Sequence, residues 1–299
     1  MSATRYLGIS FYNNHLQLAE VEHGKAPQVT VLAEQQSEVD LNGSLSGTDP
    51  QIATLAAELK QMMKRNKVRA EIISFAVPTD AVFINVIPVD IDLYEGDLQK
   101  HLQWELAQYN PSAGPRDFVI DSHALPLTNT EAQDMFMVGV QRGTAAFIQK
   151  VTAELNLTMN IIDIDQFSTE KTLIANYPEI LEHDIVLFGL RGDSLDASVI
   201  HEGQMTDYRL YHENDATKAV RDYLKYLGER YNSRPAGLLL HGINVTQDIV
   251  MTLREETGIK QTVALNSLRK VSASDKLSLP MRNESQKFAA AIGLALRSK

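Results

Sequence analysis

Alternation of apolar and polar residues along the chain predicts one group of five elements twice. In the first copy we expect strands at 5–10, 15–22 and 28–36, a helix at 49–66 and a strand at 71–77. In the second copy we expect strands at 184–190, 195–201 and 205–211, a helix at 215–231, a strand at 237–241 and a further helix at 246–257. Each copy has the order βββαβ, in which a helical crossover joins three antiparallel strands to a parallel strand.

Turn and cap residues support two of these boundaries. Asn13-Asn14 lies between the first two strands, and asparagine tolerates the left-handed geometry of a hairpin turn. Asp49-Pro50 suits the start of a helix, because aspartate caps the first free N–H groups and proline is favoured in the first turn. The first copy therefore begins with a hairpin and continues into a capped helix.

The segment between the two copies has a different pattern. Its expected strands are 82–86, 118–124, 135–141 and 159–164, and its expected helices are 93–109, 144–155 and 165–175. No Gly/Ser-rich linker or low-complexity tract interrupts the segment, so we expect closely packed domains. The middle segment is therefore an insertion or a small domain within the first half of the chain.

Composition excludes several classes of protein. The 299 residues include no cysteine, which excludes disulfide frameworks, thiolate zinc sites and cysteine nucleophiles. The net charge of −10 is the opposite of what a phosphate-neutralising nucleic-acid binder needs. With no signal peptide and no apolar stretch of about 20 residues, the chain is expected to be a soluble protein of the cytoplasm.

Charge is nevertheless uneven along the chain. From Lys260 onward, eight basic residues stand against only Asp275 and Glu284. A basic C-terminal segment of this kind suits either a membrane surface or an acidic partner, or forms an ordinary solvated surface.

Paired carboxylates are the strongest hints of metal chemistry in the sequence. Asp163 and Asp165 alternate on an expected strand, as do Asp90 and Asp92, so each pair shares a face and suits a divalent ion. The simpler interpretation is that both pairs mark strand ends that meet solvent. The eight histidines show no zinc-site spacing, so the sequence predicts no zinc site.

Two further residues have both a functional and a structural interpretation. His241 ends an apolar strand, where it lines a site or serves as a hydrogen-bonded structural histidine. Trp104, the single tryptophan, lies at helical spacing between leucines, where core packing is the simpler role and anchoring a partner peptide is the alternative.

Six stretches of the sequence carry a family resemblance. They are YLGISFYNNHLQLAEVE at 6–22, LQKHLQWELAQYNP at 98–111, FVIDSHA at 118–124, MNIIDIDQFSTEKTL at 159–173, LLLHGINV at 238–245 and FAAAIGLALRS at 288–298. In this order, over nearly the whole chain, they resemble the PilM family of type IV pilus assembly proteins, which are actin-like and related to FtsA. The resemblance implies an actin-like α/β fold built from duplicated RNase H-like βββαβα units with an inserted small α+β subdomain.

The same resemblance implies a division of the chain. Residues 1–78 would form the first RNase H-like unit, 79–158 an inserted SHS2-like α+β subdomain, 159–182 the strand and helix that complete the first half, and 183–299 the second unit. Nucleases share the RNase H-like unit and need a carboxylate on its first strand to hold metal. That position is Ser10, which argues against nuclease chemistry.

Departures from the family pattern fall in the nucleotide site. Ser10 stands where the family has the aspartate that orients the metal-water shell, Tyr12 replaces a phosphate-approach glycine and Gln17 replaces a lysine. In the second phosphate loop Phe188 or its neighbour takes the place of the aspartate, and the paired adenosine-loop glycines are reduced to Gly242. The resemblance implies these remaining nucleotide-loop positions: Ser10, Asn13, Asn14, Gly189, Gly192, Ser194 and Gly242.

These losses predict a non-catalytic protein with no cofactor, or with weak affinity for ATP and magnesium. The resemblance then implies a scaffold of the pilus inner-membrane platform that contacts the membrane only through its partners. One expected partner is the tail of a PilN-like membrane protein, bound in the region 79–158. The others are further platform proteins and, in a homo-oligomer, other copies of the chain itself. The alternatives are an ATP-binding switch with diverged loops, or a GspL-like cytoplasmic component of type II secretion.

Overall fold

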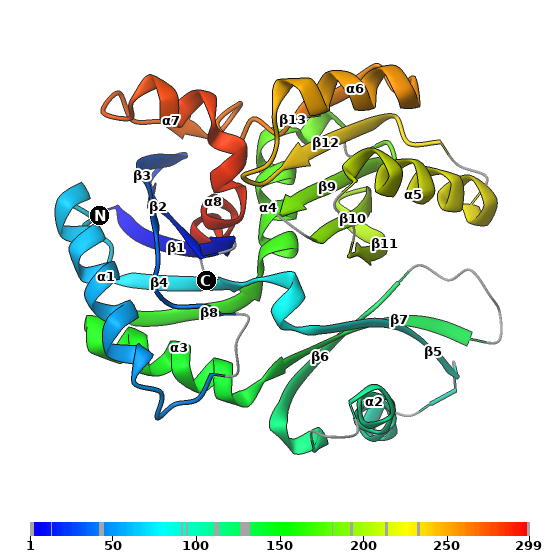
Figure 1. The fold of residues 1–299 in the computed structure, drawn as a ribbon, viewed down its shortest axis with the longest axis horizontal. Coiled ribbons are helices and arrows are strands. Elements are labelled where there is room, and N and C mark those ends of the chain that lie inside the picture. The colour runs from blue at the N-terminus through cyan, green and yellow to red at the C-terminus, as the bar shows by residue number, and fades with distance from the viewer. Residues whose placement is uncertain are drawn as a thin grey trace.

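The computed structural model describes residues 3–12, 14–41, 45–90, 92–93, 95–110, 114–125, 132–180, 182–191, 194–212, 215–231 and 234–297. Within them the strands form three sheets, of six, five and three strands. Figure 1 shows the two larger sheets side by side, with the small sheet and its helix below them. The α/β fold with duplicated units expected from the sequence is confirmed.

The six-stranded sheet contains the first predicted repeat. Its elements are β1 (Thr4–Tyr12), β2 (His15–His23), β3 (Pro27–Gln36), α1 (Gln51–Asn66), β4 (Ile72–Val77), β8 (Thr158–Ile164) and β14 (Ser272–Ala273). The strand order is β14-β3-β2-β1-β4-β8, with β1 antiparallel to β2 and parallel to β4. At its turns, Asn14 adopts φ 64° and the Asp49 carboxylate accepts a hydrogen bond of 2.8 Å from the Gln51 amide. The hairpin turn at Asn14 agrees with the prediction, and Asn13 lies outside the described residues. Asp49 bonds to the start of the helix as expected, but Pro50 holds the N-cap position and the first helical residue is Gln51.

The five-stranded sheet contains the second repeat. Its elements are β9 (Ile185–Arg191), β10 (Ser194–His201), β11 (Gln204–Tyr211), α5 (Ala216–Tyr231), β12 (Gly237–His241), α6 (Gln247–Thr257) and β13 (Gln261–Ala264). Its order, β11-β10-β9-β12-β13, again has three antiparallel strands and a parallel neighbour. The helices α5 and α6 bury apolar side chains against one face of this sheet.

The three-stranded sheet lies in the inserted segment. It consists of β5 (Phe83–Asp90), β6 (Phe118–Ala124) and β7 (Ala132–Gln141) in the order β5-β7-β6. The helix α2 (Glu95–Tyr109) covers it and supplies Leu102 and Leu106 to its core. Trp104 on this helix is 57% exposed, so the expected core role for the tryptophan is wrong, because its position faces away from the leucine stripe.

Helix α3 (Arg142–Leu155) follows β7 in the chain but packs elsewhere. Phe147, Ile148 and Val151 lie in the same buried cluster as α1 and β1. The short helices are η1 (Thr79–Ala81), η2 (Pro115–Asp117), η3 (Pro178–Ile180), α7 (Leu279–Asn283) and η4 (Ser285–Phe288). The four-part division of the chain at 78, 158 and 182 stays a prediction.

Helices α4 (Asp165–Asn176) and α8 (Ala289–Leu296) lie between the two larger sheets (Figure 1). All eight residues of α8 are buried, against β1, β2 and α4. Two glycines permit this approach, since a Cβ on Gly8 would lie 1.9 Å from the Ala291 carbonyl oxygen and one on Gly293 1.7 Å from that of Ser168. Alanine at either position would force the backbones apart, so α8 couples β1 closely to α4.

Candidate functional site

The two strand pairs expected to bind phosphates face one another across the molecule. β1 ends at Tyr12 and β9 ends at Arg191, and the Arg191 guanidinium carbon lies 5.3 Å from the centre of the Tyr12 ring. The Tyr12 hydroxyl also reaches the Nδ1 atom of His241, 3.3 Å away at the end of β12. All three side chains are buried, so side chains fill the space between the two strand pairs.

Arg191 lies between two buried carboxylates. Its Nε atom is 3.1 Å from Oδ2 of Asp165, the first residue of α4, and its Nη2 atom is 2.7 Å from Oδ2 of Asp196 on β10. The Thr79 hydroxyl in η1 accepts a hydrogen bond from Arg191 Nη1 and lies 2.5 Å from Asp165 Oδ1 and 2.9 Å from Asp196 Oδ2. This arrangement pairs one cation with two anions and links both halves of the molecule to the inserted segment.

A chain of neutral hydrogen bonds continues from His241. Burial, followed by the nearby Arg191 charge, holds the pKa of His241 well below its usual range, so the ring is neutral. Its Nε2 atom lies 2.8 Å from the Gln166 Oε1 atom, which can only accept, and therefore carries the proton. Its Nδ1 atom then accepts from the Tyr12 hydroxyl, while Gln166 donates to Ser198 Oγ at 2.9 Å. His241 is thus the hydrogen-bonded structural histidine of the simpler interpretation.

Burial sets the protonation of the charged groups in this cluster. It raises the pKa of Asp165 to about 7 and raises that of Asp196, although the Arg191 charge pulls both down. For Arg191 burial acts in the opposite direction, but Asp165 and Asp196 together raise its pKa. The arginine is always charged, so the two aspartates take up protons as the pH falls, Asp165 already near pH 7.

The expected nucleotide-loop positions that the structure describes are buried beside this cluster or lie in the turns next to it. Ser10 is fully buried and donates to Gln17 Oε1 at 3.4 Å on the neighbouring strand. Ser194 donates to the Arg191 carbonyl oxygen at 3.4 Å, and Asn14 occupies the β1–β2 turn. Asn13 and Gly192 lie outside the described residues.

The two remaining glycines are explained by close packing. A Cβ on Gly189 would lie 2.1 Å from the Asp196 Oδ1 atom. Gly242 has φ +104°, and a Cβ there would lie 2.4 Å from the Leu190 carbonyl oxygen. Both glycines therefore make room for the protein's own atoms in this structure.

Sequence patterns missed the charged centre of the site. Thr79, Gln166, Arg191 and Asp196 are not singled out by the sequence patterns. Asp165 is considered there only together with Asp163, as a pair for a divalent ion or as the end of a strand. The available signal was a charged residue at the end of the apolar segment IVLFGLR and another inside SLDASVIH, because a buried charge on a strand needs a partner.

The paired aspartates do not cooperate in a metal site. Asp163 pairs with Arg297 at 3.0 Å and accepts from Ser168 at 2.8 Å, whereas Asp165 faces Arg191. Asp90 accepts from the Asp92 backbone amide at 3.0 Å, a local turn. Among the described residues no group of three or more His, Asp or Glu side chains is placed to hold a metal ion.

A groove runs between the inserted sheet and the first half. It is a cavity of about 330 Å³ between β6, the edge strand of the small sheet, and β8, the edge strand of the six-stranded sheet. Phe136, Val138 and Phe167 line it with apolar surface, and Asp121 and Asp163 with carboxylates. Burial raises the pKa of Asp163, while Arg297 lowers it. Among the described residues, the groove joins the edge strands of two sheets to an apolar floor.

Comparison with known proteins decides the family. The model of the family described as type IV pilus assembly protein PilM matches residues 8–216. This chain belongs to the PilM family. Its fold is similar to a chain of a solved PilM–PilN type IV pilus biogenesis complex, with a TM-score of 0.80, 18% identity and 98% of each chain covered.

Two more distant structures share the actin-like fold with this member of the PilM family. A Bacteroides thetaiotaomicron protein with an actin-like ATPase fold and unknown function has a TM-score of 0.52 at 14% identity, with 88% of this chain and 91% of that one covered. The cytoplasmic domain of EpsL, an inner membrane component of the Vibrio cholerae type II secretion system, has a TM-score of 0.50 at 10% identity, with 99% and 96% covered. No curated protein matches the sequence.

Family membership makes the chain an actin-like protein of type IV pilus assembly. Against the PilM-family pattern, the departures at Ser10, Tyr12 and Gln17 fall on fully buried residues. In the part of the chain that the structure describes, no helix is both long and apolar enough to span a membrane.

Proposed function

We propose that this PilM-family chain is a non-catalytic scaffold of the pilus inner-membrane platform that binds the cytoplasmic N-terminal tail of a PilN-like membrane protein. The observation that carries the non-catalytic role is the buried cluster of Tyr12, Asp165, Arg191 and Asp196. It occupies the space between the two strand pairs that the family resemblance assigns to phosphates.

Electrostatics opposes nucleotide entry at this cluster. A triphosphate would have to displace Tyr12 from His241 and approach two aspartates whose countercharge is Arg191. Breaking a buried ion pair by removing one partner costs about 3–5 kcal/mol, and a nucleotide that drew Arg191 away would leave both carboxylates buried without a cation. Ser10 and Gln17, which are hydrogen-bonded to one another, are uncharged and therefore cannot offset that cost.

Strand edges support the groove between β6 and β8 as the tail site. An extended peptide can add to a sheet edge through main-chain hydrogen bonds, while pockets for alternate side chains give specificity. The apolar floor at Phe136, Val138 and Phe167 suits apolar side chains of the tail. The carboxylate of Asp121 suits a basic side chain or the amino terminus of the tail, whereas Asp163 is already paired with Arg297. The solved PilM–PilN complex has this fold.

Calorimetry with a synthetic N-terminal peptide of the PilN-like partner tests the groove. Val119, which lines the groove and is 44% exposed, is changed to arginine. Met251, 48% exposed on α6, is changed to arginine as the matched control. We expect the peptide to bind the wild type and Met251→Arg equally, and Val119→Arg at least tenfold more weakly. Equal loss in both variants, or no peptide binding to the wild type, would refute the groove.

Titration with Mg-ATP in the same calorimeter tests the non-catalytic role. We expect no binding up to millimolar ATP, and therefore no rise of the melting temperature with added nucleotide. Micromolar ATP binding would instead favour the nucleotide switch. A scaffold of this kind would lie at the cytoplasmic face of the inner membrane, held there by the partner's tail.

A further inference from the structure

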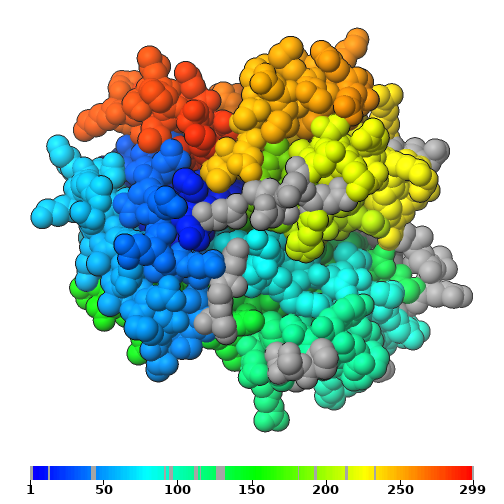
Figure 2. Space-filling model, in the orientation of Figure 1, coloured from blue at the N-terminus to red at the C-terminus, as the bar shows by residue number. Residues whose placement is uncertain are grey.

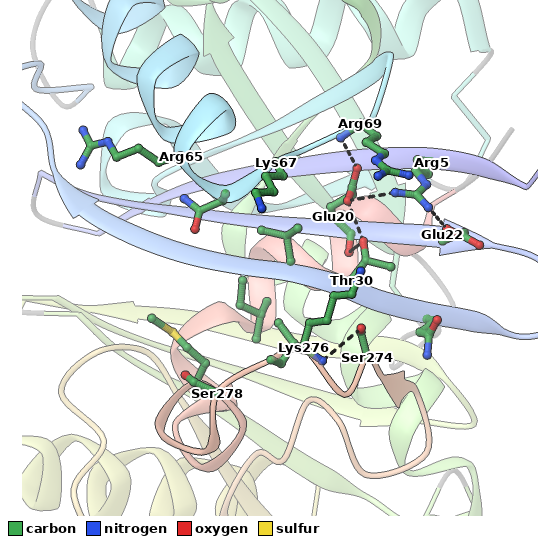
Figure 3. A pocket seen from close by; sticks show the side chains of 16 residues that line it. Arg5, Glu20, Glu22, Thr30, Arg65, Lys67, Arg69, Ser274, Lys276 and Ser278 are labelled. Atoms are coloured by element: carbon green, nitrogen blue, oxygen red, sulfur yellow. Dashed lines mark hydrogen bonds and ion pairs between the residues drawn. The ribbon is translucent and has the colours of Figure 1, made fainter.

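A basic hollow lies at the edge of the six-stranded sheet away from the tail groove. The groove borders β8, whereas the hollow is lined by β1 to β3, towards the other end of the strand order, and by residues that follow β14. Its volume is about 600 Å³, and its walls are β1 to β3, the C-terminal end of α1, and residues 274–281 (Figure 3). The hollow is therefore separate from both the central cluster and the proposed tail site.

Five cations line this hollow in a chain whose net charge is −10. They are Arg5, Arg65, Lys67, Arg69 and Lys276, accompanied by the carboxylates of Glu20 and Glu22. Figure 3 shows Lys276 on the wall opposite Lys67 and Arg69, with Arg65 extending outward at one end. Separate segments of an acidic protein thus bring like charges together.

The two carboxylates of the hollow are already engaged. Glu22 pairs with Arg5, and Glu20, which is 1% exposed, has its Oε2 atom 3.7 Å from Arg5 Nη1. Glu20 also accepts hydrogen bonds from the Arg69 backbone amide at 2.6 Å and from the Thr30 hydroxyl at 2.7 Å. Buried in this way, Glu20 fixes the Arg69 backbone and neutralises Arg5.

The remaining four cations, Arg65, Lys67, Arg69 and Lys276, form no ion pair with any carboxylate that the structure describes. The C-terminal end of α1 favours nearby cations through its partial negative charge, which accounts for Arg65 and Lys67. It does not account for Arg69, which lies beyond the helix, or for Lys276, which comes from the opposite wall.

Polar donors complete the hollow. The hydroxyls of Thr30, Ser274 and Ser278 and the amide of Asn66 line the same space. Ammonium, guanidinium and hydroxyl groups together are the donor set that recognises phosphate oxygens. We propose that this hollow binds a phosphate-bearing anion, either a soluble phosphate compound or the headgroup of an anionic lipid.

One neighbouring residue distinguishes the two sources. Leu279 follows Ser278, a residue that lines the hollow, and is 71% exposed. An exposed apolar side chain beside a basic patch can insert into the lipid interface while the basic groups bind the headgroups. A soluble anion makes no contact that needs such an apolar side chain. A lipid source therefore requires Leu279, and a soluble source does not.

The test uses the purified full chain with two probes. Calorimetry measures the binding of inorganic pyrophosphate, and flotation measures binding to vesicles of phosphatidylglycerol in phosphatidylcholine. The variant combines Lys67→Gln, Arg69→Gln and Lys276→Gln, and Arg69→Gln keeps the backbone amide that Glu20 binds. The matched control removes three exposed cations elsewhere, through Lys100→Gln, Lys150→Gln and Lys225→Gln. Circular dichroism melts confirm that both triple variants fold.

We expect at least one probe to bind the wild type and the control alike. The hollow variant should bind it roughly a hundredfold more weakly at low salt, a factor of about five for each cation. Pyrophosphate binding identifies a soluble ligand. Binding to anionic vesicles alone, weakened further by Leu279→Ser, identifies a lipid headgroup. Binding of neither probe, or equal weakening in the control, overturns the proposal without touching the tail groove, which the peptide titration tests separately.

Discussion

Replacing Arg191 by methionine tests whether the space between the two halves is a dry, charge-balanced core. The substitution keeps much of the apolar volume of the arginine stem but removes the guanidinium that contacts Asp165 at 3.1 Å and Asp196 at 2.7 Å. Both carboxylates are fully buried. Thr79 alone would remain within hydrogen-bonding distance of both.

The expected cost is about 3–5 kcal/mol of unfolding free energy at pH 7, the usual range for removing one partner of a buried ion pair. That is a large part of the roughly 5–15 kcal/mol available to a folded protein. Arg191 normally lowers the pKa of both aspartates against the effect of burial. Without it their folded pKa values rise further above the unfolded value of about 4. The penalty is then absent below pH 4 and grows as the pH rises towards and past 7.

Urea unfolding followed by circular dichroism at pH 5 and pH 7 measures this penalty. Arg221→Met, at an exposed position on α5, should change the stability by less than about 0.5 kcal/mol at either pH. Combining Arg191→Met with Asp165→Asn and Asp196→Asn should recover most of the loss, because no buried charge remains unpaired. If Arg191→Met loses less than about 1 kcal/mol of unfolding free energy at pH 7, and the same amount at pH 5, water reaches the two aspartates. The space between the two halves would then be open to solvent.

Two further predictions concern the helices between the sheets. Gly293→Ala should destabilise the protein by more than about 2 kcal/mol, because its Cβ would lie 1.7 Å from the Ser168 carbonyl oxygen. The control, Gly228→Ala on α5, has open space around it and should be neutral or stabilising by up to about 1 kcal/mol. Thermal melts compare the two variants, and equal effects would contradict the close approach of α8 to α4. Burial raises the pKa of Glu170 to about 8, despite a hydrogen bond from Ser198, so its contribution to stability falls as the pH rises from about 4.5 to 8. Glu170→Gln should therefore gain on the wild type between pH 5 and pH 8 in urea titrations, by up to about 5 kcal/mol, and a constant difference would contradict the assigned burial.

Local patterns were enough to predict most strands and long helices of the fold, although not β13, β14 or α7. The strand at 118–124, the strand at 237–241 and the cap at Asp49 agree with the structure because neighbours in sequence determine them. The central cluster could not be predicted in this way. Thr79 and Arg191 are 112 residues apart, and only the assembled sheets bring them together. Trp104 shows the opposite error, since leucines at helical spacing suggested a core position for a residue that lies on the outer face.

The buried position of α8 has a consequence for how the protein is made. A ribosome releases β1 and β2 long before residues 289–296, yet one face of these strands is covered by α8. Until the last helix emerges, Tyr6, Ala19 and Val21 on that face lack their native cover. Contacts between residues so far apart in sequence slow folding, and they leave partly folded intermediates with exposed apolar surface that tend to aggregate. We therefore expect nascent chains ending before residue 289 to need chaperones, and the N-terminal half to become protease-resistant only when synthesis reaches α8.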